Sequence, residues 1–111
     1  MIRGVAALGL CSWDRFVVTD SYPGPGEYAV VRAQFEQAGG TTANTCAALA
    51  RLGLDVLFAS YVGDDVEGEQ LIESLRSVGC RTEHIRRRAG ARSDSGIIVV
   101  SGQAPNRDRT I

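Results

Sequence analysis

The sequence predicts an α/β fold, because short apolar segments that suit β-strands alternate with segments of helical periodicity. Mostly apolar runs occupy Val5–Leu10, Val56–Val62 and Gly96–Val100. Between the first and third of these runs, residues 43–52 and 67–78 repeat small or apolar side chains every three to four positions. The order is therefore strand, hairpin-like segment, helix, strand, helix, strand, which indicates an α/β protein.

The first third of the chain is predicted to hold a buried strand and a hairpin-like segment. The unbroken apolar run Val5–Leu10 is typical of a strand covered on both faces, and Phe16–Val18 forms a second short strand. Ser21–Gly26 predicts a loop, since its prolines fix φ and its glycines permit unusual values. Tyr28–Phe35 alternates loosely between apolar and polar residues, as a half-exposed strand does.

Two helices are predicted, and each ends at a glycine. Ala38–Thr42 interrupts the strand pattern and opens the first helix, which Gly53 ends because glycine tolerates the left-handed conformation. A stripe of small residues lets this helix lie close to a sheet. The second helix follows Gly63, with Asp64 predicted as its N-terminal cap and Glu67 returning a bond to the backbone. The stripes are Ala43, Ala47 and Ala50 in the first helix and Leu71, Leu75 and Val78 in the second.

Beyond the second helix the sequence predicts further strands. Thr82–Ile85 and Gly96–Val100 are two of them, a polar turn covers residues 101–108, and Thr110–Ile111 begins another. The basic run Arg86–Arg88 is interpreted as a solvated strand end, with a phosphate or partner contact as the alternative.

Composition argues against several classes of function. The formal charge of -1 gives no general attraction for nucleic acid or anionic membranes. The cysteines Cys11, Cys46 and Cys80 form no CxxC pair and have only His84 as a histidine partner, so no zinc site is expected. Reduced thiols, together with the lack of an apolar segment long enough to span a bilayer, predict a cytoplasmic protein.

The segment Ala38–Asn44 is the most informative candidate for a binding site. Gly39 and Gly40 let the backbone approach a ligand without Cβ clashes, and the helix that follows exposes unpaired N–H donors. Asn44, in the first turn, offers an amide donor and a carbonyl acceptor. This combination suits a ligand with several hydroxyl groups, or a phosphate through the helix dipole. A tight strand-to-helix turn without any ligand is the alternative.

Asp14 is the second candidate, because it follows the first predicted strand at its carboxyl end, where ligands of open α/β sheets commonly bind. Its carboxylate can accept hydrogen bonds from two vicinal hydroxyls. Ser12 lies two residues earlier, so in an extended segment it points the same way. Pairing of Asp14 with an arginine, or the capping of a turn, is the alternative. The binding hypothesis requires Asp14 and Asn44 to converge on one pocket.

A series of segments in order resembles the landmarks of the PfkB family of ribokinase-like carbohydrate kinases, and together they cover essentially the whole chain. The segments are Gly9–Asp14, Tyr22–Glu27, Gly39–Gly53, Val62–Gly68, and Ser95–Val100 with Asp108–Ile111. The resemblance implies that residues 1–111 form the N-terminal part of a central, mostly parallel sheet with flanking helices. It also implies a small β lid, from about 15–37 and 96–111, and the absence of the C-terminal, ATP-binding half.

The same resemblance implies phosphoryl transfer from ATP, with Mg²⁺, to a hydroxyl of a sugar or nucleoside. Ser12 stands where ribokinases usually have asparagine, and Thr41 stands where they often have lysine. Both departures argue against ribose as the substrate. The family's catalytic base lies in a glycine–alanine–glycine–aspartate segment, and a magnesium-associated asparagine and glutamate motif precedes it; neither is found in the sequence. We therefore expect no catalytic, cofactor-binding or metal-binding residue here, and no kinase activity from this chain by itself. The expected substrate-binding residues are Ser12, Asp14, Gly39, Gly40, Thr41, Asn44 and Arg109.

Two alternatives to a kinase stay open at this point. One is a non-catalytic binding or assembly module that a partner chain completes, and the other is a phosphate-binding regulatory domain that rests only on the Gly39–Gly40 turn. Trp13 is interpreted either as an apolar wall for a sugar ring or base, or as a core residue. Because lids of the family often pair between subunits, a homodimer through the lid strands is expected, and neither a nucleic acid nor a membrane is expected as a partner.

Overall fold

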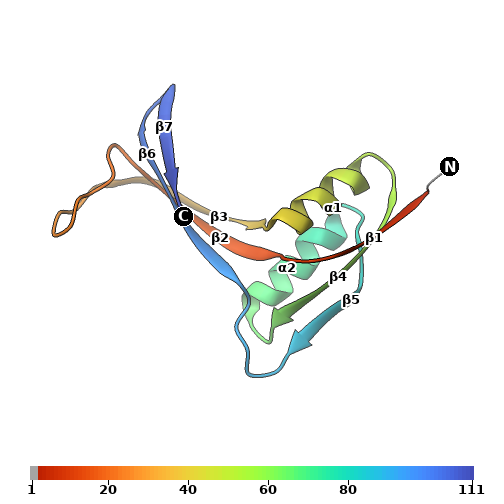
Figure 1. Cartoon of the computed structure of the whole chain (residues 1–111). Helices are drawn as coiled ribbons and strands as arrows, with labels where there is room; N and C mark the ends of the chain where they lie inside the picture. The colour runs from red at the N-terminus through yellow and green to blue at the C-terminus, as the bar shows by residue number, and fades with distance from the viewer. Residues whose placement is uncertain (1–2) are drawn as a thin grey trace. The chain divides into compact units, whose positions relative to one another are not determined.

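The computed structural model describes residues 3–111, which form seven strands and two helices (Figure 1). The chain divides into two compact units, each described by itself. The core unit comprises residues 3–13 and 38–94, and the strand unit comprises residues 14–37 and 95–111. The elements are β1 (Gly4–Leu8), β2 (Ser12–Thr19), β3 (Val31–Gly39), α1 (Thr41–Arg51), β4 (Asp55–Gly63), α2 (Val66–Ser77), β5 (Arg81–Arg88), β6 (Ser95–Gln103) and β7 (Asn106–Thr110).

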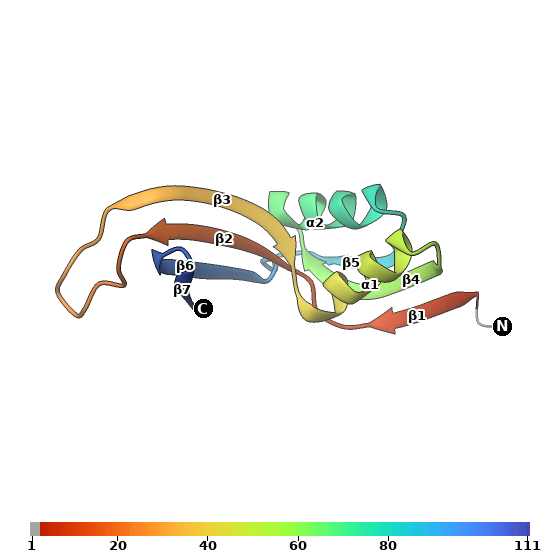
Figure 2. The same cartoon turned by 90° about the horizontal axis from the view of Figure 1, so that it is seen from above.

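The core unit is a parallel sheet with both of its helices on one face, which confirms the predicted α/β class (Figure 2). The strand order is β1-β4-β5, and both neighbouring pairs run parallel. Parallel neighbours need a crossover connection. Here α2 crosses over between β4 and β5, and α1 precedes β4. Packing places α1 against β1 and β4, and α2 against β4 and β5.

The hydrophobic core lies between β4 and the two helices. Alternate residues of β4, among them Val56 and Phe58, have no exposed surface and meet the buried stripe of α2. The other face of the sheet is open, since Tyr61 of β4 is 67% exposed and Leu8 of β1 is 81% exposed. The prediction that Val5–Leu10 is covered on both faces is therefore wrong for the described residues. An apolar run indicates that its residues suit a strand, but it does not indicate how many faces are covered. Here both helices lie on the same face of the sheet, so the other face is exposed.

Asp65 caps α2, not Asp64 as the sequence predicts. Asp65 has an extended backbone, and its Oδ1 accepts a hydrogen bond of 2.8 Å from the N–H of Gly68. The same carboxylate accepts bonds from Ser93, 2.7 Å from its N–H and 2.6 Å from its hydroxyl. Asp64 is exposed. An aspartate at either position suits an N-cap, but only Asp64 has a glutamate three residues later, so the approach of Ser93 from the loop after β5 selects Asp65 against that pattern.

Asp65→Asn is expected to flatten the dependence of stability on acidic pH. The hydrogen bonds from Ser93, then that from Gly68, hold the pKa of Asp65 below its ordinary value. A carboxyl whose pKa is lower in the folded than in the unfolded chain contributes stability that is present above the unfolded pKa, about 3.9. That contribution is lost as the pH falls through the folded pKa.

Urea unfolding measured between pH 2 and pH 7 checks this expectation. The variant should be less stable than the natural chain at pH 7, and the difference should shrink toward pH 2. Asp64→Asn is the matched control, because the exposed Asp64 side chain makes none of these bonds, and it should follow the natural curve. Parallel curves for Asp65→Asn and the natural chain would contradict the assignment.

The strand unit contains most of a four-stranded sheet of order β3-β2-β6-β7. β6 and β7 form an antiparallel hairpin in which Gln103 pairs with Asn106. The predicted polar turn over residues 101–108 is therefore wrong in length, because the strands continue to Gln103 and resume at Asn106. Backbone pairing between β6 and β7 keeps these polar residues in extended strands, although their residue types favour turns. Phe16 and Phe35 stack with 4.7 Å between ring centroids.

The structure bears on the basic run Arg86–Arg88 and on the length of the helices. Arg86–Arg88 ends β5 and is exposed, as expected for a solvated strand end. Within it Arg87 pairs with Glu69, and Arg88 lies 5.7 Å from the centre of the Tyr61 ring. Among residues 3–111 neither helix is long and apolar enough to cross a bilayer.

Candidate functional site

The start of α1 is packed against the connection between β1 and β2. Gly40 is the N-cap residue, with φ 100° and ψ 136°, a conformation that L side chains rarely adopt. A Cβ at this position would lie 2.7 Å from the carbonyl oxygen of Leu10 and 2.8 Å from the Cα of Cys11. Gly9 is equally restricted, because a Cβ there would overlap the Thr42 side chain. Of the glycine pair predicted to allow the approach of a ligand, Gly40 thus allows the close approach of the chain to itself.

The first turn of α1 leaves hydrogen-bond donors free. The N–H of Ala43 donates to the Leu10 carbonyl at 3.2 Å, and the N–H of Asn44 donates to the Gly40 carbonyl at 2.9 Å. Within residues 3–111 the N–H groups of Thr41 and Thr42 have no acceptor. This turn contains no acidic residue, so nothing offsets the positive end of the helix dipole. The helix start therefore offers two N–H donors to a ligand.

Asn44 adds a side-chain amide to these donors. Its side chain is exposed, and in the described part of the chain it has no hydrogen-bond partner. Gly39, the last residue of β3, is buried, and the Thr41 side chain is exposed in the first turn. Ser12 is 8% exposed and directly follows Cys11, which contacts Gly40. The core unit thus brings Ser12 near the start of α1, where Gly39, Gly40, Thr41 and Asn44 lie.

A small network of hydrogen bonds links Cys11, the residue before Ser12, to Ser60 of β4 and to Gly9. The Cys11 thiol donates to the Ser60 hydroxyl at 3.6 Å, and that hydroxyl donates to the Gly9 carbonyl at 2.7 Å. Burial raises the pKa of the Cys11 thiol, only partly offset by the bond to Ser60. The thiol therefore stays protonated at neutral pH and acts as a positioning group rather than as a nucleophile.

Asp14 belongs to the strand unit and lies within β2, not beyond the end of a strand as the sequence suggests. Its side chain is half-buried and lies against the backbone of Gly96, where a Cβ would come 2.9 Å from Oδ1. Across residues 3–111 no arginine and no N–H group pairs with this carboxylate. The alternative in which Asp14 serves an ion pair or a turn therefore finds no support. A half-buried carboxylate without a partner is a candidate acceptor for a ligand.

Arg109 is not brought next to Asp14. It is exposed on β7 and pairs in register with Val100 of β6. Val100 is four residues from Gly96, which corresponds to about 13 Å along an extended strand. Within the strand unit, Arg109 and Asp14 therefore lie at separate places on the sheet.

Trp13 packs against the hydrophobic core of the core unit. The main-chain N–H of Trp13 donates to the main-chain carbonyl of Asp94 at 2.9 Å, which ties the start of β2 to the loop before β6. The Trp13 side chain is partly buried by its packing against the core, which agrees with the interpretation of Trp13 as a core residue.

The described residues do not fit a resident metal or nucleotide. No group of three or more histidine, cysteine, aspartate or glutamate side chains in residues 3–111 could hold a metal ion. The clearest acidic candidate, Asp65, already accepts bonds from Gly68 and Ser93 through both of its oxygens. The sequence contains no GxxxxGK[ST] or GxGxxG phosphate loop.

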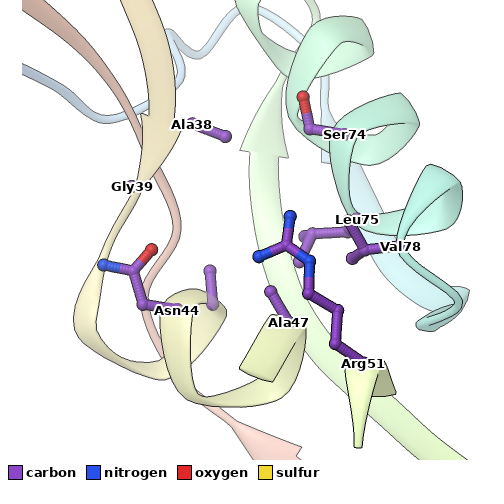
Figure 3. Close-up of a pocket in the computed structure, with 9 residues that line it drawn as sticks. Ala38, Gly39, Asn44, Ala47, Arg51, Ser74, Leu75 and Val78 are labelled. Carbon is purple, nitrogen blue, oxygen red and sulfur yellow. The ribbon is translucent and has the colours of Figure 1, made fainter. Parts of the chain in front are cut away.

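Sequence reasoning missed a small cavity between α1 and α2 (Figure 3). The cavity measures about 150 Å³, and Gly39 and Asn44 line one side of it. Arg51 and Ser74 also line it. Arg51 follows Asn44 by seven residues, or two helical turns, so the spacing places both on one helix face. The seven-residue spacing of Asn44 and Arg51 was the signal in the sequence for a shared polar face of α1. It does not indicate that α2 with Ser74 faces them.

Comparison with known proteins gives a consistent family. Residues 3–111 match the profile described as pfkB family carbohydrate kinase. The ribokinase of Bacillus subtilis is 34% identical over 112 residues, covering 91% of this chain and 38% of the relative. A nucleoside kinase of Methanothermobacter thermautotrophicus is 32% identical over 81 residues, covering 73% of this chain and 26% of the relative.

Solved structures agree with these sequence relatives. The ribokinase of Cryptococcus neoformans in complex with ADP superposes with a TM-score of 0.78 at 25% identity, covering 99% of this chain and 34% of that one. A fructokinase of Xylella fastidiosa with bound ATP gives a TM-score of 0.70 at 26% identity, covering 99% of this chain and 33% of that one. The chain spans between 26% and 38% of the length of these proteins.

Proposed function

Because the chain belongs to the pfkB family of carbohydrate kinases, we propose that it supplies the substrate-binding part of a kinase that phosphorylates a sugar or nucleoside hydroxyl with ATP. The observation that carries this proposal is the Asp14 carboxylate, half-buried against Gly96 and without a partner among the described residues. Buried carboxylates are costly unless a donor meets them. A pair of ligand hydroxyls supplies such donors.

The start of α1 supports the same class of ligand. The free N–H groups of Thr41 and Thr42 are not restricted to anions, because they also donate to neutral hydroxyl oxygens. The Asn44 amide both donates and accepts, as a hydroxyl does. We propose that Asp14 and Asn44 are each substrate-binding residues, with Ser12, Gly39, Gly40 and Thr41 in supporting contacts and Arg109 as a further contact.

ATP and Mg²⁺ belong to the proposal as co-substrate and metal of the whole enzyme. When bound, ATP supplies the phosphoryl group that the substrate hydroxyl accepts. We propose that the residues that hold ATP and the catalytic base lie outside these 111 residues, and that the chain by itself does not turn over. We also propose a cytoplasmic location, in keeping with three free cysteines, and pairing of two chains through strands of the strand unit.

Ligand binding by the intact chain tests the substrate assignment. Calorimetry with a panel of sugars and nucleosides should find at least one ligand. Asp14→Asn and Asn44→Ala should each weaken that ligand by about tenfold or more, since a hydrogen bond to a charged or buried group is lost. Gly96→Ala should weaken it as well, because the added Cβ displaces the carboxylate without removing it.

Asp108→Asn is the control, because Asp108 is an exposed aspartate of the same unit and should leave affinity unchanged. Binding that ignores Asp14→Asn would refute the assignment. A coupled assay with ATP addresses the second claim, and turnover from pure material would refute the proposal that the catalytic groups lie elsewhere.

The competing proposal is a non-catalytic binding or assembly module completed by a partner chain. It is favoured by the open sheet face that carries Leu8 and Tyr61. Co-purification with a second polypeptide that adds no kinase activity would support it, whereas activity gained on adding the partner would support the kinase.

A further inference from the structure

The cavity between α1 and α2 carries a positive charge that the protein leaves unpaired. The cavity lies within the core unit, and the Arg51 guanidinium is directed into the space between the two helices (Figure 3). Arg51 is in the last turn of α1. Helical side chains lean toward the N-terminus of their helix. The guanidinium therefore lies beside Ala47 rather than at the helix end, where its charge would serve the dipole.

Within residues 3–111 the Arg51 side chain makes no hydrogen bond and no ion pair, and this distinguishes it from the paired arginines of the same chain. On the facing helix α2 the carboxylate of Glu73 pairs with Arg76 at 3.0 Å. The paired arginines with their carboxylates are Arg15 with Glu36, Arg32 with Asp20, Arg76 with Glu73, Arg81 with Glu83, and Arg87 with Glu69.

Two further polar groups border the same space. Ser74 of α2 lines the cavity, and its hydroxyl has no partner among the described residues. Asn44 lines the opposite side, next to Gly39. The small side chain of Ala47 keeps the space between them open, and Leu75 and Val78 form its apolar wall. The lining thus offers several donors and one positive charge, while no carboxylate is part of it.

We infer that this cavity is a binding site for a small oxyanion, with Arg51 as the charged ligand-binding residue and Ser74 as a hydroxyl donor from the facing helix. A guanidinium presents parallel N–H donors that match two oxygens on one phosphorus, sulfur or carboxyl carbon. A volume of about 150 Å³ exceeds the roughly 30 Å³ that one water molecule occupies in the liquid. The space is therefore sufficient for an ion of this class.

The cavity shares Gly39 and Asn44 with the proposed sugar contacts, but its charged residue Arg51 and the hydroxyl of Ser74 are not among those contacts. Its charge comes from the far end of α1 and not from the free N–H groups of Thr41 and Thr42. An oxyanion bound there links α1 to α2. Because it binds the folded core unit only, it raises the stability of that unit in proportion to the logarithm of its concentration above Kd.

The experiment uses the intact chain without sugar or ATP. Unfolding is followed by the fluorescence of Trp13, the single tryptophan, which packs against the core. Inorganic phosphate, sulfate and malonate are titrated at constant ionic strength set with potassium chloride, and calorimetry with phosphate measures binding directly. The natural chain should show a saturable rise in stability with at least one of the three anions, and the arm that binds best identifies the preferred oxyanion.

Three variants locate the site. Arg51→Met keeps the apolar stem and should weaken anion binding by about tenfold or more. Ala47→Leu fills the cavity while Arg51 stays, and it should abolish binding. Arg76→Met is the matched control, since Arg76 is also a last-turn arginine but is paired with Glu73, and it should bind as the natural chain does.

Two results would overturn the inference. One is the absence of saturable stabilisation in the natural chain with all three anions. The other is an equal loss in Arg51→Met and Arg76→Met, which would indicate general screening of charge. If Arg51→Met fails to fold, Ala47→Leu and Arg51→Lys decide the matter. Asp14→Asn should leave anion binding intact, so failure of this inference and failure of the proposed sugar contacts are told apart.

Discussion

Gly40→Ala is expected to destabilise the core unit by about 3–5 kcal/mol, because two separate penalties act at one position. The first is conformational, since φ is 100° at this N-cap residue. The second is steric, because the new Cβ meets backbone atoms of Leu10 and Cys11 at 2.7–2.8 Å. Backbone atoms cannot rotate away as a side chain can. Either α1 moves off the β1–β2 connection, or its first turn unwinds.

The loss should show both in urea unfolding followed by Trp13 fluorescence and in ligand affinity. Native domains are stable by only about 5–15 kcal/mol, so the variant should be close to unfolding at moderate temperature. Gly53→Ala is the matched control. It has φ 89° at the other end of α1, yet a Cβ there meets nothing within 4 Å. It should lose only about 1–2 kcal/mol from strain. Equal losses in the two variants would show that the close contact with Leu10 and Cys11 is unimportant.

Phe58→Ala is expected to cost about 3–5 kcal/mol, the range seen when a buried phenylalanine is truncated. Phe58 has no exposed surface, and it is the largest side chain among the fully buried residues described. It lies on the face of β4 that both helices cover. Its removal leaves a cavity under α1 and α2 together, so neither helix can close the space alone.

Tyr61→Ala gives the comparison on the same strand. Tyr61 lies three residues later, so its side chain is on the opposite face, and it is 67% exposed. Its contact with Arg88 contributes only about 0.5–1 kcal/mol at an exposed site. Urea unfolding should therefore separate the two variants by at least about 2 kcal/mol. Similar losses would mean that the open face of the sheet is covered in solution.

The start of α1 could be predicted from sequence because its determinants are local. Two glycines, then a stripe of small residues, require a close turn into a helix whatever the remote chain does. The helix indeed begins at Thr41, and of the predicted stripe Ala43 is buried while Ala47 and Ala50 are partly buried; Cys46, which the stripe did not include, is buried as well. What sequence could not supply is the contact that makes Gly40 obligatory, because Leu10 and Cys11 are about thirty positions away.

The choice between neighbouring aspartates shows the opposite case. The capping pattern favours Asp64, which Glu67 follows by three residues, yet Ser93, 28 positions beyond Asp65, bonds to Asp65, and Asp65 is the cap. Asp14 is similar, since its residue type predicts a ligand contact, but the contact with Gly96 and the lack of an arginine partner became visible only in the folded strand unit. Its convergence with Asn44 remains a prediction that the binding variants test.

The sequence by itself determined the alternation of strands and helices and the start of α1, because steric preferences and periodicity act over a few residues, and the order of its motifs indicated the kinase family by resemblance. Only the tertiary structure decided which face of the sheet is covered, which aspartate caps α2, and which arginines pair with a carboxylate. Burial and charge pairing depend on residues brought together from distant parts of the chain. Arg51 and Ser74 share a cavity for this reason, although 23 positions separate them.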